Sequence, residues 1–318
     1  MIDSKSKAGL IRATIIVVLM MCLCVAALFL VNSYSLADIG LILESELLLP
    51  AVLLQIISIM LFIQAWKFLL SMDTRIRFSF LECTSHIGVT LMGKYIPGKI
   101  WGLVGRSYLL TRRGHSKSDA VNLLVADQFL TFYSGIAVGT IVLLAYFSGV
   151  TAIATLLVFV VCSPYIIKSY DSIIQRVFRW SKLFLKRLSA EIEPEVITIH
   201  RTFFGISLLS YLIHWLLISL VLCLLFYPVI AFDLPRNSLL IVAAIPLAML
   251  SGFIALWAPG GVGVREAVIV LILSLNLPVK IALSVAITYR LLCVLNDLCT
   301  GCFAVYFFSR SGSSLIEK

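Results

Sequence analysis

Charged residues are scarce in this 318-residue sequence. Asp, Glu, Lys and Arg make up 13% of it, whereas hydrophobic residues make up 61%. An average soluble domain has roughly 25% charged residues, so this chain has too little charge for an ordinary soluble fold. Its mean hydropathy of +1.08 instead indicates an integral membrane protein, whose helices satisfy their own backbone hydrogen bonds.

Residue patterns of common enzymes and metal sites are also missing. The sequence has no HExxH, HxxxxD or GxSxG pattern and no clustered aspartate pair, which such chemistry would need as base, nucleophile or metal ligand. The eight cysteines lie almost entirely in apolar segments, where they are interpreted as small buried hydrophobic residues. We therefore expect no enzyme activity, no catalytic residue, no metal and no cofactor.

The net charge of +9 does not indicate nucleic-acid binding, because the basic residues lie in short loops between apolar runs. Such clusters are typical of cytoplasmic loops. Each apolar run is close to the roughly 20 residues that a spanning helix needs. These runs occur at 10–31, 47–70, 120–146, 149–168, 203–228, 238–257 and 280–308. The charges place both termini in the cytoplasm.

The longest polar connection has a helical period of its own. Over 171–188, basic residues share one helix face and mostly apolar residues the other, a pattern typical of a helix lying in the headgroup layer. Lipid recruitment and simple anchoring both explain it. The sequence thus predicts a single membrane domain over 1–318, with halves at 10–168 and 203–308.

A first irregular segment contains two short arms, 81–96 and 100–110, separated by Pro97-Gly98. Neither arm can cross a hydrocarbon core about 30 Å thick. Both flanks are basic, so the segment is predicted to enter and leave on one side as a re-entrant hairpin.

A second irregular segment, 239–275, is broken at 258–263. Its first arm is long enough to span, but we favour a second hairpin that enters from the opposite side. The predicted fold is an all-α polytopic membrane protein with about six full spans and two re-entrant hairpins, or eight or more spans. Matching breaks in the two halves also predict an inverted repeat.

Both breaks combine Pro-Gly, further glycines and a following arginine. Broken backbone at membrane depth is tolerated where it faces protein or a wet cavity, and new helix N-termini with nearby cations suit an anion such as phosphate. A simple kink with snorkelling lysines is the alternative. The candidate substrate-binding residues are Lys94, Pro97, Gly98, Lys99, Arg106, Pro259, Gly260, Gly261, Gly263, Arg265 and Glu266.

The stretches GKYIPGKIWGLVGRSYLLTRRG and APGGVGVREA resemble the bacterial flippase-like family that includes the membrane region of lysylphosphatidylglycerol synthase. The resemblance covers about residues 10–308. Asp127 matches an acidic position of the family, Gln128 stands where arginine is common, and Tyr289-Arg290 matches a later pair. The resemblance implies the lipid-translocating region in the bacterial cytoplasmic (inner) membrane, rather than the aminoacyl transferase.

Four charged residues fall within apolar runs: Asp127, Glu266, Arg290 and Asp297. Charges at such positions are costly and usually paired or functional. Arg290 and Asp297 are seven residues apart, too far for a local pair, so partners on other helices are expected. Structural bridging and a role of Asp127, Arg290 and Asp297 in coupling or gating explain the pattern equally well.

These features favour a flippase that moves an anionic phospholipid or a polyprenyl-phosphate-linked glycan precursor between leaflets. A membrane-embedded transferase and an accessory subunit of envelope lipid or polysaccharide synthesis are the alternatives. The expected partners are membrane lipids and not nucleic acid.

Overall fold

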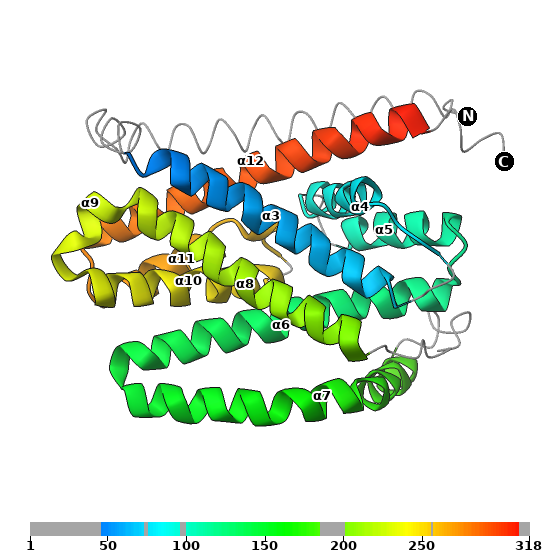
Figure 1. Ribbon diagram of the computed structural model, residues 1–318, viewed down its shortest axis with the longest axis horizontal. Coiled ribbons are helices and arrows are strands. Elements are labelled where there is room, and N and C mark those ends of the chain that lie inside the picture. Colours follow the sequence, from blue (N-terminus) through cyan, green and yellow to red (C-terminus); the bar gives the residue numbers. More distant parts are fainter. Residues whose placement is uncertain (1–45, 73–75, 96–99, 185–200, 256, 312–318) are drawn as a thin grey trace.

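The computed structural model describes residues 46–72, 76–95, 100–184, 201–255 and 257–311, and all regular secondary structure in them is helical (Figure 1). The first four helices are α3 (Leu48–Leu70), α4 (Phe80–Gly93), α5 (Trp101–Arg112) and α6 (Lys117–Phe147). They are followed by α7 (Gly149–Phe184), α8 (Arg201–Leu225), α9 (Tyr227–Ile230), the 3₁₀ turn η1 (Ala231–Asp233), α10 (Leu234–Ile254), η2 (Pro259–Gly261), α11 (Val264–Leu273) and α12 (Val279–Ser311).

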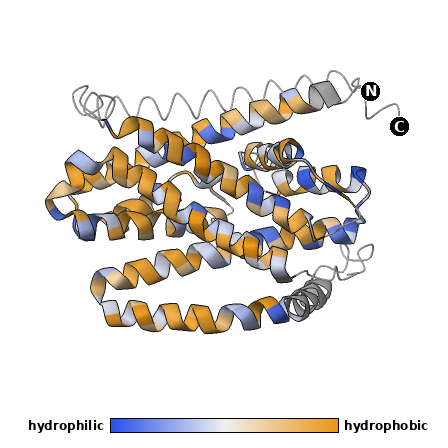
Figure 2. Ribbon diagram, viewed as in Figure 1, coloured by the Kyte–Doolittle hydropathy of each residue, from blue (hydrophilic) through white to orange (hydrophobic). Residues whose placement is uncertain are grey.

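Six helical stretches are long and apolar enough to cross a membrane, which confirms the all-α polytopic prediction. They are Leu48–Leu70, Lys117–Phe147, Gly149–Tyr170, Thr202–Leu225, Tyr227–Ile254 and Val279–Phe307. Most residues of these stretches are coloured as hydrophobic (Figure 2). The predicted segment 10–31 lies outside the described residues.

Helix α7 lies at the edge of the molecule (Figure 1) and contributes little to its interior. Its backbone stays helical through Pro164 to Phe184. The first part of the predicted interfacial helix is therefore the end of α7, while residues 185–188 fall outside the described part. The expected position of this segment in the headgroup layer stays a prediction.

The first hairpin consists of α4 and α5, with 14 and 12 residues. At 1.5 Å per residue each arm is about 20 Å long, shorter than a hydrocarbon core. Local sequence fixes its open end. Ser79 and Glu82 form a capping box at the start of α4, and Gly114, with φ of 102°, makes the turn from α5 toward α6.

The second hairpin consists of α10 and α11, with 21 and 10 residues. Gly260, Gly261 and Gly263 have φ values of 59°, 74° and 83°, a conformation that favours glycine. The two hairpins open at opposite ends of the molecule (Figure 1). Their tips meet in its interior, where the Gly260 N–H donates to the Lys94 carbonyl at 3.1 Å.

Helix packing follows a two-fold pattern. Helices α3 and α8 pack along each other, α4 packs on α12, and α10 packs on α6. The second arm of each hairpin contacts the next helix, α5 on α6 and α11 on α12. In chain order, α3, α4, α5 and α6 of the first half correspond to α8, α10, α11 and α12 of the second half. The contact of α4 with α12 therefore corresponds to the contact of α10 with α6. This exchange of partners is what an inverted repeat predicts.

Candidate functional site

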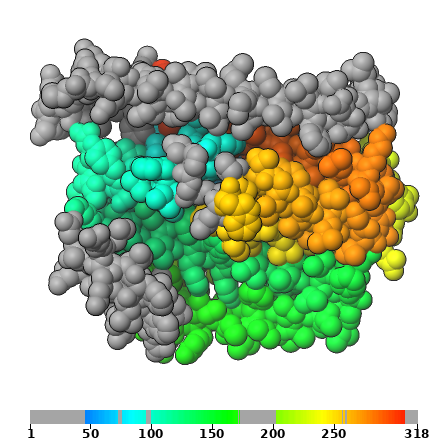
Figure 3. Space-filling model, turned by 180° about the vertical axis from the view of Figure 1, so that it is seen from behind, coloured from blue at the N-terminus to red at the C-terminus, as the bar shows by residue number. Residues whose placement is uncertain are grey.

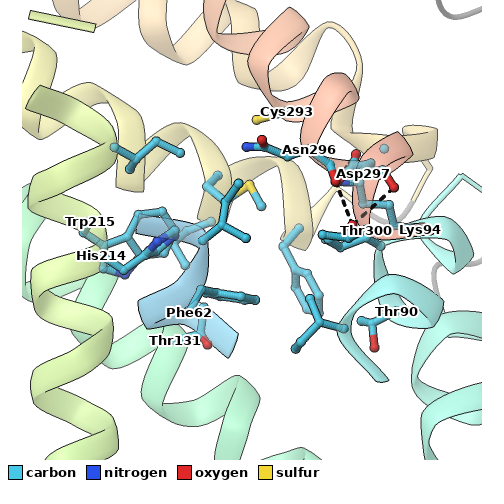
Figure 4. A pocket seen from close by; sticks show the side chains of 18 of the residues that line it. Phe62, Thr90, Lys94, Thr131, His214, Trp215, Cys293, Asn296, Asp297 and Thr300 are labelled. Atoms are coloured by element: carbon cyan, nitrogen blue, oxygen red, sulfur yellow. Dashed lines mark hydrogen bonds and ion pairs between the residues drawn. The ribbon is translucent and has the colours of Figure 1, made fainter. Parts of the chain in front are cut away.

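A cavity of about 170 Å³ lies beside the two hairpin tips. Its walls come from α3, α4, α5, α6, α8, α10, α11, α12 and the η2 turn, and most of the lining side chains are apolar. Lys94, Asn296, Asp297 and Thr300 gather on one side, across from His214 and Trp215 (Figure 4). Seen from behind, α11 (gold) lies between the start of α12 (orange) and the first hairpin (cyan) (Figure 3).

Arg265 brings a positive charge to this cavity from the first turn of α11. The residue is only 3% exposed, and it lines the cavity. Within the described part of the chain, its Nε and Nη1 have no hydrogen-bond partner. A buried guanidinium with two unsatisfied nitrogens and no ion pair among the described residues is costly, so this geometry favours an anionic ligand.

Lys94 faces the same cavity but is already engaged. Its Nζ lies 2.6 Å from Oδ2 and 2.8 Å from Oδ1 of Asp297 on α12. The neighbouring Tyr95 donates its hydroxyl to Oδ2 at 2.5 Å. Asp297 thereby ties the tip of the first hairpin to α12.

Arg290 on α12 connects the second hairpin tip to α12, as Asp297 does for the first. Its Nε lies 2.7 Å from Oε1 of Glu266, and its Nη1 donates to the Gly260 carbonyl at 3.0 Å. Neither Arg290 nor Glu266 lines the cavity. The expected interhelical partner of Arg290 is therefore present, and the pair holds the η2 turn against α12.

Arg106 and Asp127 form a separate buried pair between α5 and α6, joined at 2.8 Å and each 1% exposed. The guanidinium lies 3.4 Å from the ring centroid of Trp66, and Asp127 accepts from the hydroxyl of Tyr211. Gln128 donates to Asp127 Oδ2 at 3.2 Å and lines the cavity.

The predicted site residues thus separate into groups. Lys94, Gly260, Arg265 and Asp297 line the cavity, whereas Arg106 and Asp127 lie apart from it. Pro259, Gly261 and Gly263 form part of the second tip, and Glu266 and Arg290 support it. Pro97, Gly98 and Lys99 lie outside the described residues. The substrate-binding and coupling roles of all of these stay predictions.

Sequence reasoning missed several residues of this region. Tyr95 lies inside the first motif, so its place beside Lys94 was a usable signal. Trp66, Tyr211 and Thr300 carry no such signal, because aromatic and hydroxyl residues are common in apolar helices. Gly252 also contacts the site, through the side chain of Arg265, and nothing in the sequence separates it from an ordinary helix glycine.

Comparison with known proteins confirms the resemblance. The family model described as the lysylphosphatidylglycerol synthase TM region matches residues 10–299, most of the chain. No curated protein and no solved structure shows a significant match. The expectation that the chain is not an enzyme is wrong, because the matched family is the membrane region of a lipid-modifying enzyme. The expectation rested on the absence of a few common catalytic motifs, and their absence does not exclude other kinds of enzyme.

Proposed function

Because the chain belongs to the lysylphosphatidylglycerol synthase transmembrane family, we propose that it moves an anionic lipid between the leaflets of a bacterial cytoplasmic membrane. The family places it among multi-pass membrane proteins of lipid synthesis or transport. The proposed cargo is an anionic phospholipid or a polyprenyl-phosphate-linked glycan precursor, and both termini are proposed to lie in the cytoplasm.

Arg265 is the observation that carries this proposal. It is a buried cation at a mostly apolar cavity, and its Nε and Nη1 lack partners within the described residues. The N-terminus of α11, where Arg265 lies, adds partial positive charge. A lipid phosphate would supply the missing acceptors, while acyl or polyprenyl chains would contact apolar walls and the bilayer.

The opposed hairpins suggest how such a lipid could pass. Their tips are joined by the Gly260 to Lys94 backbone hydrogen bond, and each hairpin opens toward its own end of the molecule (Figure 1). In the proposed cycle, movement of one tip exposes the cavity to one leaflet while the other tip keeps it closed. This is the arrangement of repeat-based transporters, in which one site is exposed alternately to the two sides.

The test is lipid translocation by purified protein in liposomes containing fluorescent phosphatidylglycerol. Replacing Arg265 with alanine should reduce the rate at least about tenfold, the effect of losing a charge-assisted hydrogen bond of roughly 1.5 kcal/mol or more. Thermal unfolding in detergent should be unchanged or shifted upward, because an unpaired buried charge is removed.

Arg113→Ala is the matched control. Arg113 is 39% exposed and pairs with Glu82 at the open end of the first hairpin, so its loss should leave translocation intact. Equal rates for wild type and Arg265→Ala would remove the support for this site. The same assay is repeated with a fluorescent polyprenyl-phosphate-linked sugar. Absence of translocation of both probes by wild-type protein would overturn the proposed function.

The family match favours a second candidate function, direct participation in modification of the lipid. The test is to incubate the purified chain with a labelled lipid donor and to look for a new lipid product. A product that forms without translocation would favour this candidate over the flippase.

A further inference from the structure

We propose that Gly252 is a positioning residue that directs the Arg265 guanidinium at the cavity; this assignment rests on the proposed function. Gly252 lies near the end of α10, opposite the first turn of α11. This position explains how an arginine with no ion pair among the described residues is held in one place.

The side chain of Arg265 occupies the space beside Gly252. A Cβ added there would lie 2.4 Å from Cγ and Nε of Arg265 and 2.9 Å from its Cδ, distances that real Cβ atoms do not adopt. A Cβ at Gly261 would lie 2.6 Å from the same Nε. The side chain of Arg265 therefore runs through a slot between two glycines, one on α10 and one in the η2 turn.

A slot of this kind has a physical purpose. A long arginine side chain loses roughly 2 kcal/mol of rotamer entropy when it is fixed, and here no ion pair within the described residues fixes it. Close packing between backbone atoms holds its stem instead. The slot thus fixes the direction of the guanidinium without a carboxylate among the described residues that would neutralise its charge.

Gly252 is the better test position of the two. Gly261 has a positive φ of 74°, so any substitution there strains the backbone whatever it does to Arg265. Gly252 lies within the α10 helix, where alanine is favoured over glycine. Any loss in Gly252→Ala therefore comes from the displaced arginine and not from the backbone.

The chain provides two matched glycine controls. Gly139 on α6 packs against Leu247, where an added Cβ would lie 2.5 Å from Cγ, so Gly139→Ala creates a comparable overlap with no arginine involved. Gly205 on α8 has nothing within 4 Å of its added Cβ. Gly139→Ala reports the cost of crowding alone, and Gly205→Ala reports the effect of the substitution without crowding.

The experiment is a double-mutant cycle on the full chain in detergent, with wild type, Gly252→Ala, Arg265→Ala and the double variant. Native mass spectrometry measures the apparent Kd for dioctanoyl phosphatidylglycerol, and dioctanoylglycerol serves as the phosphate-free probe. We expect Gly252→Ala to weaken binding of the phosphate lipid about tenfold or more. The double variant should bind no more weakly than Arg265→Ala, and both controls should bind as wild type does.

Thermal unfolding of the same variants tests the slot independently of function. If the Gly252 Cβ collides with Arg265, the unfolding temperature lost in Gly252→Ala should be recovered when Arg265→Ala removes the colliding atoms. The double variant could recover its stability while wild-type protein binds no phosphate lipid. That result would support the packing of Arg265 against Gly252 but would overturn the proposed function. Wild-type affinity in Gly252→Ala, or an equal effect of the substitution with and without Arg265, would overturn the positioning role.

Discussion

The two hairpins have the same topology but use their charges differently. In the first, Arg106 on the second arm pairs with Asp127 on the following helix, α6. In the second, Glu266 on the second arm pairs with Arg290 on the following helix, α12. The signs are exchanged, yet each hairpin is tied to the next helix by one ion pair.

The two hairpins differ in the further cation that each one brings to the cavity. The first hairpin also presents Lys94, but Asp297 neutralises it. Arg106 and Arg265 each have two buried nitrogens without a hydrogen-bond partner in the described part of the chain. Arg106 is nevertheless paired with Asp127, whereas Arg265 of the second hairpin has no ion pair among the described residues. Both hairpins therefore contain structural ion pairs, and the second also contains Arg265, the cation proposed to bind the ligand. Three substitutions can break or sharpen this division.

The largest effect is expected for Arg106→Ala. Removing one member of a buried ion pair leaves the other charge uncompensated, which typically costs about 3 to 5 kcal/mol, and stacking on Trp66 is lost as well. The free energy of unfolding in detergent should fall by that amount, whereas Arg265→Ala should lose none. An Arg106→Ala variant with wild-type stability and no translocation would place Arg106 in the binding machinery and break the comparison.

A smaller effect, in the opposite direction, is expected for Asp297→Asn. Asp297 holds Lys94 at the edge of the cavity, and the substitution would give the cavity a second uncompensated cation. Affinity for dioctanoyl phosphatidylglycerol should rise about tenfold, or roughly 1.4 kcal/mol, in the same binding assay. The increase should disappear in a Lys94→Met, Asp297→Asn double variant. Weaker binding in Asp297→Asn would mean that the carboxylate itself contributes to the site.

The general fold could be predicted because it follows from local sequence. Apolar length defines the spans, and Pro-Gly breaks between arms define the hairpins. The Glu266 partner of Arg290 could also be anticipated, since both are costly charges in apolar runs. The pairing of Lys94 with Asp297 could not, because 203 residues separate them and Lys94 also fits a snorkelling lysine. Gly252 could not be identified because its role depends on a side chain that only the folded hairpin brings to it.

The smallest effect on stability is expected for Glu266→Gln. This substitution tests whether the two hairpin tips move independently. Glu266 is 22% exposed on its side chain, and Arg290 keeps its hydrogen bond to the Gly260 carbonyl, so the loss should be about 1 kcal/mol. Hydrogen exchange should accelerate at 257–263, where the second tip loses a support, and stay unchanged over 80–112. Equal acceleration in both regions would show that the tips move as one unit. The backbone hydrogen bond from Gly260 to Lys94 would then be part of a contact strong enough to couple the hairpins. A cycle in which one tip moves while the other stays closed would have to be abandoned.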